Sequence, residues 1–528
     1  MIRNIFILFL STLAIISFGQ RNVVLIIADD LGTDYFGFYD DHKDTVDVPN
    51  IRKLLQNGIK FNQATANPVC SATRATILTG RYGFRTGVGD IVGGTGGSNP
   101  LDTSEITIPK LLKMNNSNIS CANIGKWHLQ QPSPTWNLLN PLRMGYDHYE
   151  GCFIGQLTNY TNWTKHTDGI QSTCTNYATT ENVNNAIEWI KKQNNKPIFL
   201  WLAFNAPHAP YHLPPLNLHS FKTLSGTQQD INQNTKKYFK AAIQAMDTEI
   251  GRFLDSLKAM NRLDSTDFIF IGDNGNTQKT AQITNIERSK GTVYEYGVHV
   301  PMIFSGPSVV NKNRNTDALV NVADIFATIL ELNGINNWQS QIPTNKPVDS
   351  KSFLPIIKNE NTKIRNWAFC ENFKLTPDSS DGKAIRNETY KLIRFDNQIQ
   401  EFYNLKIDKD ETNNLLKSKM SIDDISNYQY LCNEMSKLVG SGDWCLGTVD
   451  NKEVFAESFE ISPNPFWDYI HISPKSENDE FILTNLIGEV VYLGNDIENQ
   501  SFNYLKSGIY FIKNKNNNWK SKKLIKIE

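Results

Sequence analysis

Cys70 and Arg74 are the residues whose types and spacing most directly suggest chemistry. They lie in the run Cys-Ser-Ala-Thr-Arg, which leads into a predicted helical stretch that ends at Gly80. The first turn of a helix offers free backbone N–H groups and a positive dipole end, and an arginine one turn later adds a fixed cation. This arrangement suits an anionic substrate or transition state. The alternative is a buried, inert cysteine beside a salt-bridged arginine.

Two pairs of oxygen-bearing side chains follow predicted buried strands. Asp29 and Asp30 come directly after one apolar run, and Asp273 and Asn274 come directly after another. Because the carboxyl ends of parallel strands share one crevice, we expect the four side chains to lie together. Adjacent carboxylates repel each other unless a cation lies between them, and an all-oxygen set favours calcium first and magnesium second. Each pair alone could be only a turn, but two pairs after buried strands favour a metal site.

Two lysines and two histidines occupy comparable positions. Lys126 and His128 follow a short predicted strand, and His208 lies between prolines directly after another. Lys290 precedes the last predicted strand of this region. Taken singly, each is better interpreted as a surface or loop residue, so their significance depends on the complete set.

The complete set, in this order over residues 22 to about 450, resembles the type I sulfatases of the alkaline phosphatase superfamily. The run Cys-x-Ala-x-Arg, continued by Leu-Thr-Gly-Arg, resembles the signature of that family. In the family a maturase oxidises the cysteine to formylglycine. The resemblance implies a sulfate ester hydrolase that uses calcium. The implied metal ligands are Asp29, Asp30, Asp273, Asn274 and Cys70; the implied catalytic residues are Cys70, Arg74, His128 and His208; and the implied substrate-binding residues are Lys126, Lys290 and His208.

The implied mechanism needs these residue types. A sulfate monoester is anionic, so Lys126, Lys290 and the metal would neutralise its oxygens. His208 would protonate the leaving alcohol, and His128 would deprotonate the second hydroxyl of the hydrated formylglycine so that sulfate is expelled. Arg74 would hold the formylglycine diol.

One segment departs from the family pattern. The family often has Glu-Gly-Gly-x-Arg-Val-Pro where this chain has Glu-Tyr-Gly-Val-His-Val-Pro, with Tyr296 and His299 at two of the positions. The departure leaves the metal and nucleophile positions intact and puts the contacts around them in question.

Alternating strands and helices predict an α/β fold, and the resemblance implies an alkaline-phosphatase-like mixed sheet flanked by helices. Apolar runs predict strands at residues 23–28, 119–124, 197–204, 268–272 and 301–305. Helices are predicted at residues 49–55 (closed by Gly58), 181–192, 235–260 and 320–332. Predicted antiparallel strands at 390–396 and 400–405, with an acidic loop, resemble the smaller α+β C-terminal subdomain of sulfatases.

The last 70 or so residues predict a separate, small all-β domain. It opens on Ile-Ser-Pro-Asn-Pro and closes on Gly-Ile-Tyr followed by a lysine-rich strand. This pattern resembles the C-terminal sorting domain of the type IX secretion system, with an ordinary β-sandwich binding module as the alternative. The expected domains are a signal peptide at 1–19, the catalytic domain at 20–345, the C-terminal subdomain at 346–450 and the sorting domain at 458–528.

Composition and targeting signals indicate an exported protein. The 528 residues carry a net charge of −1, which gives no reason to expect nucleic-acid binding. A basic start and a short apolar run at residues 1–19 predict a signal peptide, with a membrane anchor as the alternative; no other run is long enough to cross a bilayer. The expected location is secreted or attached to the cell surface, after passage through the periplasm.

Seven cysteines fit an oxidising compartment. If Cys70 is reserved for chemistry, the other six allow 15 pairings. Short loops favour Cys152–Cys174 and Cys432–Cys445 as disulfides, and Cys121 is expected to be a core thiol.

Taken together, the sequence predicts a secreted sulfatase that acts on a sulfated polysaccharide or its oligosaccharides. Algal ulvan, carrageenan or fucoidan and animal glycosaminoglycans are all compatible with an exported enzyme. Two alternatives remain. One is a phosphodiesterase or phosphonate hydrolase of the same superfamily, and the other is a catalytically inactive glycan-binding protein.

Overall fold

The computed structural model describes residues 21–39, 42–94, 96–440, 445, 460–473, 479–486, 488–515 and 521–528. The chain divides into two compact units, Met1–Ser441 and Gly442–Glu528. The predicted signal peptide lies outside the described residues, as do the predicted boundaries at 450 and 458. Among the helices that are described, none is both long and apolar enough to span a membrane.

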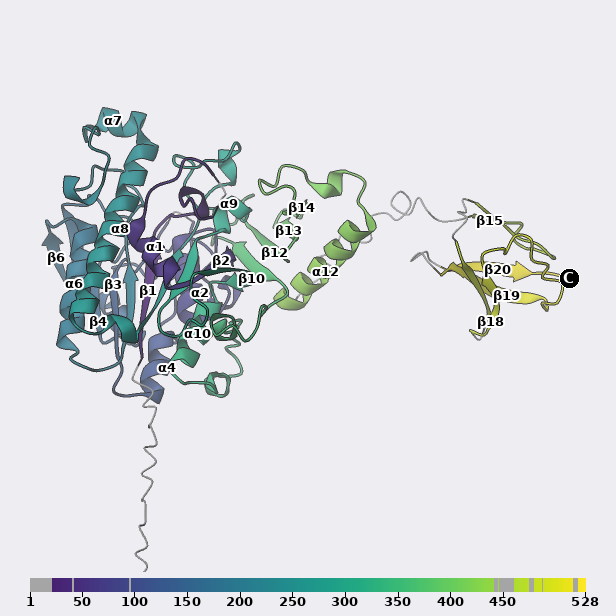
Figure 1. Ribbon diagram of the computed structural model, residues 1–528, viewed down its shortest axis with the longest axis horizontal. Coiled ribbons are helices and arrows are strands. Elements are labelled where there is room, and N and C mark those ends of the chain that lie inside the picture. The colour runs from purple at the N-terminus through teal and green to yellow at the C-terminus, as the bar shows by residue number, and fades with distance from the viewer. Residues whose placement is uncertain are drawn as a thin grey trace, which may run out of the picture. The chain divides into compact units, whose positions relative to one another are not determined.

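A ten-stranded mixed sheet forms the centre of the first unit (Figure 1). Its strands are β1 Asn22–Ala28, β2 Gly58–Thr65, β3 Ser120–Gly125, β4 His148–Gly151, β5 Trp163–Thr167, β6 Ile170–Cys174, β7 Ile198–Ala203, β8 Thr266–Gly272, β9 Met302–Ser305 and β10 Arg314–Asn321. They lie in the order β10-β2-β9-β8-β1-β7-β3-β4-β5-β6. Neighbours from β8 to β4 are parallel, β9 is antiparallel to both of its neighbours, and β5 and β6 form an antiparallel hairpin at one edge. The predicted mixed α/β sheet is confirmed.

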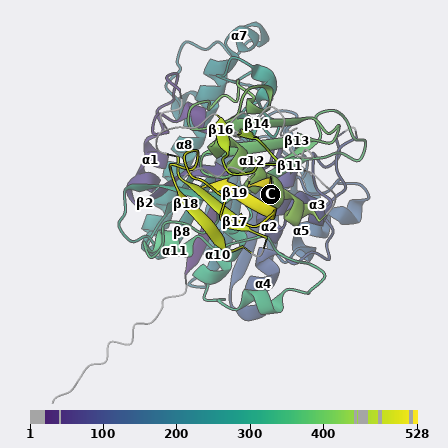
Figure 2. The same cartoon turned by 90° about the vertical axis from the view of Figure 1, so that its right-hand side faces the viewer.

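Helices cover both faces of this sheet. They are α1 Pro49–Gln56, α2 Cys70–Thr79, α3 Gly83–Thr86, α4 Ile108–Asn115, α5 Asn140–Arg143, α6 Ala178–Lys192, α7 Gln228–Gln233, α8 Thr235–Ala259, α9 Glu295–Val298, α10 Asp324–Leu332 and α11 Leu354–Ile357. Val23, Leu25 and Ile27 of β1 belong to one core with α2, α4 and α10, which gather together in both views (Figures 1 and 2). Val24 and Ile26 belong to a second core with α1, α6 and α8. Burial on both faces explains why β1 is a continuous apolar run.

A four-stranded antiparallel sheet and one helix complete the first unit. They are β11 Ala368–Asn372, β12 Gly382–Arg386, β13 Tyr390–Phe395, β14 Gln400–Asn404 and α12 Ile422–Val439. The strands follow one another in the order β11-β12-β13-β14, and the predicted pairing of the strands now labelled β13 and β14 is present. The helix α12 begins with a capping box between Ser421 and Asp424.

The second unit is built from short antiparallel strands. They are β15 Glu460–Ser462, β16 His471–Ser473, β17 Phe481–Asn485, β18 Val490–Gly494, β19 Gly508–Asn514 and β20 Lys522–Lys526. The first two pair with each other, and the other four form a sheet in the order β18-β17-β19-β20. Phe466, Phe481, Leu483 and Ile512 belong to a core of this unit's own. The predicted small all-β domain is confirmed.

Two predicted boundaries need correction. Gly58 does not close α1 but begins β2, where a Cβ atom would lie 2.1 Å from the Phe304 carbonyl oxygen, so close strand approach requires the glycine. The stretch predicted as a helix from residue 320 starts later, because Val320 belongs to β10 and pairs with β2. The Asn321 N–H donates to the Asp324 carboxylate at 2.8 Å, and α10 begins at Asp324.

The predicted Cys152–Cys174 disulfide is wrong, because both thiols are free. Cys152 follows β4 and Cys174 ends β6, and β5 lies between these strands. Neighbouring strands are about 4.8 Å apart, so two strand spacings exceed the roughly 4.4–6.8 Å between Cα atoms that a disulfide spans. Cys432 and Cys445 are disulfide-bonded, in agreement with the prediction. Cys121 is a free, buried thiol in β3, as expected.

Candidate active site

Loops that are far apart in the sequence meet at the carboxyl edge of the central strands. The parallel neighbours β1 and β8 end in register, so Asp29 and Asp273, the next residue after each strand, lie side by side. β7 flanks β1 on its other side, and β3 pairs with β7. Lys126 follows β3 directly, and His208 lies in the loop after β7. The strand order therefore brings residues from four separate stretches to one place, as expected for this edge of a parallel sheet.

Four of the five predicted metal ligands, Asp29, Asp30, Asp273 and Asn274, form one buried cluster. The Asp30 N–H donates to Asp273 Oδ1 at 3.0 Å, and Asn274 Nδ2 donates to Asp30 Oδ1 at 2.8 Å. Asp29, Asp273 and Asn274 have no exposed surface, and Asp30 is 1% exposed. Asp30 has a φ of 61°, a left-handed conformation that is uncommon for a residue other than glycine and that recurs at functional sites.

Three cations pair with the three carboxylates. The ion pairs are Lys126 Nζ to Asp29 Oδ2 at 2.6 Å, Arg74 Nη2 to Asp273 Oδ2 at 2.8 Å and Lys290 Nζ to Asp30 Oδ1 at 2.5 Å. Burial raises the pKa of Asp29 to about 8, Lys126 opposes this shift, and the neighbouring carboxylates reinforce it. Burial also disfavours ionised Asp30, but Lys290 and His208 outweigh it and hold the pKa of Asp30 below its usual value.

The oxygen atoms of this cluster fit a hard divalent cation. Asp29 Oδ1, Asp30 Oδ2 and Asn274 Oδ1 are buried and have no hydrogen-bond partner among the described residues. The potential ligand atoms of Asp29, Cys70 and Asp273 lie within 4.8 Å of one another, and so do those of Asp29, Asp30 and His208. Buried polar atoms are rarely left without a partner, and carboxylate and amide oxygens are the ligands that calcium and magnesium prefer.

Cys70 is the first residue of α2 and is 1% exposed. Its Sγ lies 3.1 Å from His128 Nδ1, and the Ser71 hydroxyl donates to the His128 carbonyl at 2.8 Å. Burial raises the pKa of the Cys70 thiol, although Lys126 and Lys290 act in the opposite direction. A protonated, buried thiol is a poor nucleophile, so the unmodified side chain is ill suited to attack an ester.

Arg74 connects two of the converging segments. Its guanidinium donates to Asp273 Oδ2 at 3.1 and 2.8 Å and to the Lys126 carbonyl at 2.9 Å. The helix that carries it extends the predicted helical stretch back to Cys70. It ends at Gly80, whose φ of 68° is the left-handed conformation expected of a glycine that terminates a helix.

His128 is held tightly beside Cys70. Its backbone has a φ of 56°, and its N–H donates to the Phe153 carbonyl at 3.1 Å. A Cβ atom on Gly155 would lie 2.3 Å from the imidazole Cε1, so the ring packs directly on that glycine. Burial, with Lys126 and Arg74 adding to it, holds the pKa of His128 well below its usual value. The imidazole is therefore neutral and able to accept a proton.

His208 faces the acidic cluster from the loop after β7. Its Nδ1 lies 2.7 Å from the Ala209 carbonyl, which can only accept, so Nδ1 carries the proton. Its Nε2 lies 3.5 Å from Asp30 Oδ2. Burial lowers the pKa of His208 to about 4, Asp30 opposes this shift, and Lys290 adds to it.

Tyr296 and His299 are the two departures from the family pattern. The Tyr296 hydroxyl contacts the Asp34 carboxylate. His299 Nε2 lies 2.8 Å from the Asn62 carbonyl, and its Nδ1 lies 3.5 Å from Thr33 Oγ1. Within the described part of the chain, no hydrogen bond or ion pair links either residue to the ten predicted site residues.

Two supporting residues were missed by sequence reasoning. Asn276 accepts from the Gly32 N–H at 3.0 Å through its side chain and from the Lys290 N–H at 2.9 Å through its carbonyl, so it ties the loop after β1 to the segment that carries Lys290. Ser71 orients the His128 backbone. Both lie one or two residues from predicted site residues, and that proximity was the only signal available.

Comparisons with known proteins identify the family of this chain. Residues 21–335 match the sulfatase family, and the chain therefore belongs to that family. Residues 288–438 match the C-terminal domain of N-sulphoglucosamine sulphohydrolase. Residues 460–528 match a secretion system C-terminal sorting domain, which identifies a protein that is secreted or placed on the cell surface.

Individual relatives are sulfatases. N-acetylgalactosamine-6-sulfatase of Homo sapiens is 27% identical over 378 residues, which make up 64% of this chain and 65% of that protein. Arylsulfatase J of Mus musculus is 26% identical over 406 residues, 71% of this chain and 64% of that protein. The chain thus spans about 65% of the length of these relatives. The solved structure of Ps i-CgsB in complex with k-i-k-neocarrahexaose has a TM-score of 0.67 and 26% identity, and the match covers 79% of this chain and 92% of that chain.

Proposed function

We propose that this protein is a secreted sulfatase that hydrolyses sulfate esters with a formylglycine derived from Cys70. The observation that carries the proposal is the buried cluster in which three carboxylates and three cations meet the Cys70–His128 pair. Membership of the sulfatase family supports the same activity.

Asp29, Asp30, Asp273 and Asn274, with the side chain at position 70, would hold one calcium ion. The three unpartnered oxygen atoms support this assignment. Magnesium suits the site less well, because it usually retains several water molecules and the ligands here are buried protein groups. When bound, the ion would polarise the sulfate group and stabilise the negative charge that develops on its oxygens.

Modification of Cys70 would remove the weakness of the buried thiol as a nucleophile. A formylglycine-generating maturase would convert the side chain to an aldehyde, whose hydrate offers two hydroxyl groups. Neutral His128, with Nδ1 3.1 Å from Cys70 Sγ, would take a proton from a hydroxyl at this position. Arg74 lies one turn along α2. Its guanidinium would hold the diol and keep its hydrogen bond to Asp273.

Lys126, Lys290 and His208 would bind the sulfate ester. Both lysines carry charge into a site where the Coulomb interaction is strong because water is excluded. A bound sulfate ester adds negative charge beside His208 and would raise the pKa of this histidine from about 4. In that state His208 Nε2 could donate a proton to the leaving alcohol.

We infer that the substrate is a sulfated polysaccharide or its oligosaccharides, such as ulvan, carrageenan or fucoidan. The sorting domain supports this inference, because an exported enzyme meets extracellular polymers and is delivered by the type IX secretion machinery. The relatives support it too: one is named for N-acetylgalactosamine 6-sulfate, and one was solved with a neocarrahexaose.

The proposal is tested by turnover of 4-nitrophenyl sulfate and bis(4-nitrophenyl) phosphate by protein produced together with a maturase. We expect sulfate turnover to dominate and to be abolished in the matched Cys70→Ala variant. Faster turnover of phosphate esters would indicate a phosphodiesterase or phosphonate hydrolase instead. Binding of sulfated glycans without any turnover would indicate an inactive glycan-binding protein.

A further inference from the structure

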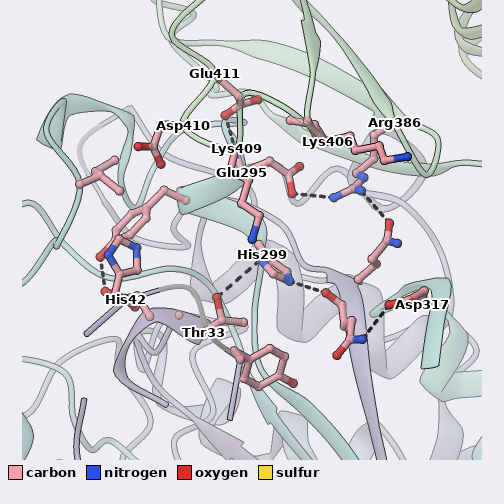
Figure 3. Close-up of a pocket in the computed structure, with 18 of the residues that line it drawn as sticks. Thr33, His42, Glu295, His299, Asp317, Arg386, Lys406, Lys409, Asp410 and Glu411 are labelled. Carbon is pink, nitrogen blue, oxygen red and sulfur yellow. Dashed lines mark hydrogen bonds and ion pairs between the residues drawn. The ribbon is translucent and has the colours of Figure 1, made fainter. Parts of the chain in front are cut away.

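A cavity separate from the catalytic cluster lies between the large sheet and the loop that follows β14 (Figure 3). Its volume is about 460 Å³. Thr33 and His299 lie on the side of the large sheet, and Lys406 and Lys409 belong to the loop that follows β14. None of the catalytic or metal-binding residues proposed above is among the described residues that line it.

The polar groups of the cavity wall are held in fixed positions. His299 Nε2 lies 2.8 Å from the Asn62 carbonyl, and Asn62 Nδ2 donates to Asp317 Oδ1 at 2.7 Å. Asn62 Oδ1 is shielded from solvent and has no hydrogen-bond partner among the described residues. Arg386 Nη1 pairs with Glu295 Oε2 at 2.6 Å. The wall is therefore preorganised and retains an unused acceptor.

Most of the charged groups that line the cavity are already paired, and Lys406 is an exposed cation among them. Most lining carboxylates already have partners. Glu295 pairs with Arg386 and Lys391, and Glu411 also pairs with Lys391. Asp317 contacts Asn62, Glu388 pairs with Lys363, and Asp34 contacts Tyr296. The exposed Asp410 carboxylate is the exception among the described lining residues. The Lys406 ammonium is also exposed, and no hydrogen bond or ion pair from it occurs within the part of the chain that the structure describes. Arg288 donates to the uncharged carbonyls of Asp410 and Glu411.

We propose that this cavity is a second binding site, one that takes a sulfated saccharide segment away from the bond being hydrolysed. Most of its lining residues are polar or charged, with Ile283 and Leu405 as the only aliphatic hydrophobic side chains among the described residues. Amide, imidazole and carboxylate groups suit sugar hydroxyls, and the lysines suit sulfate groups. Figure 3 shows Lys409 directed toward His299, across the cavity. The choice of a saccharide as the ligand rests on the proposed function.

Such a site would act by raising the local concentration of a long substrate at the catalytic cluster. An oligosaccharide with several sulfate groups would gain from it, whereas a single aryl sulfate is too small to occupy both places. The cavity is therefore expected to affect binding of long substrates.

The test uses the full chain with Cys70→Ala, so that bound ligand is not consumed. The cavity variant is Lys406→Met with Lys409→Met. The matched control is Lys417→Met with Lys419→Met, which removes two exposed lysines from the same subdomain but outside the cavity lining. The probes are labelled hexasaccharides of carrageenan and of chondroitin 6-sulfate, each with a desulfated counterpart. We expect the cavity variant to raise the Kd of a sulfated probe about fivefold, from two exposed charge contacts, and the control to leave it within about twofold.

Equal affinity in the cavity and control variants would overturn the inference, and so would the failure of every sulfated probe to bind. A second measurement uses the same lysine variants with Cys70 intact and maturase present. If 4-nitrophenyl sulfate turnover fell as much as hexasaccharide affinity, the lysines would act on the catalytic cluster and the separate site would be refuted. If the protein hydrolysed no sulfate ester but still bound the probes through these lysines, the proposed function would fail and this inference would stand.

Discussion

Lys391 of β13 anchors the segment that carries Lys290. Its Nζ lies 3.0 Å from Glu295 Oε1 and 3.1 Å from Glu411 Oε1, and its side chain is 2% exposed. Glu411 Oε2 also accepts from the Glu295 N–H at 2.6 Å. Since Glu295 begins α9 only five residues after Lys290, this buried cluster holds a proposed sulfate-binding residue in place.

Replacing Lys391 by Met removes the cation and keeps most of the side-chain volume. Glu295 retains its ion pair with Arg386 at 2.6 Å, so the loss falls on Glu411. Removing one partner of a buried ion pair costs roughly 3–5 kcal/mol, and because only one carboxylate loses its cation we expect about 3 kcal/mol at pH 8.

This cost should depend on pH. Burial raises the pKa of Glu411 from 4.5 to about 7, against the effect of Lys391, and removal of Lys391 raises it further. An acid whose folded pKa exceeds its unfolded pKa destabilises the fold as pH rises between the two values. At pH 5.5 Glu411 is protonated with or without Lys391, so the variant should lose only about 1 kcal/mol there.

Urea unfolding followed by tryptophan fluorescence at pH 5.5 and pH 8 measures both values. Lys437→Met is the matched control: Lys437 is 73% exposed and pairs with Glu434 at 2.8 Å, so its loss should leave the stability close to that of the wild type. We also expect kcat/KM for 4-nitrophenyl sulfate to fall in the Lys391 variant. The reasoning would be refuted if the Lys391→Met variant were as stable as the wild type at pH 8. It would also be refuted if the variant lost the same free energy of unfolding at both pH values.

Four further predictions concern the site and the fold. Asp273→Ala, or chelation of the wild type, should remove both calcium, measured by elemental analysis, and sulfate turnover; active protein without metal would contradict this. Mass spectrometry of the active enzyme should find an aldehyde at Cys70, and full activity with an intact thiol would exclude the mechanism. Non-reducing peptide mapping should find a single disulfide, Cys432–Cys445, and any second linked pair would be inconsistent with the free thiols of the structure. Burial opposes protonation of His148, but hydrogen bonds to two carboxylates outweigh it and raise the pKa of His148 to about 9. The gain from these bonds, about 1 kcal/mol after allowance for solvent screening, is present in full below about pH 6.5 and is lost as pH rises through 9. His148→Gln should therefore lower the thermal midpoint at pH 6 and match the wild type above pH 10, and a constant difference would contradict this.

The sequence predicted much of the site because the signal is local. Asp29 and Asp273 each follow a continuous apolar run, and such runs form strands buried on both faces of a parallel sheet. Any residue directly after such a strand lies at the carboxyl edge. The polar residues after the strands could therefore be grouped before the strand order was known.

Other features depend on partners that are distant in the chain. The free thiols of Cys152 and Cys174 follow from β5, which lies between the strands that carry them. The sequence predicts that Val320 begins a helix, because hydrophobicity alone does not distinguish a buried strand from a buried helix. Pairing with β2 determines that it is a strand.

The sequence by itself determined the class of fold, the sulfatase-type motif around Cys70 and the separate C-terminal domain. These depend on residue type, periodicity and spacing between near neighbours, which are written directly in the chain. Only the tertiary structure decided that Lys391 and Glu411 hold the Lys290 segment, and that Asn62, His299 and the loop after β14 enclose a cavity separate from the catalytic cluster. Those contacts join residues that are tens to hundreds of positions apart, and no local pattern encodes which distant side chains a sheet order will bring together.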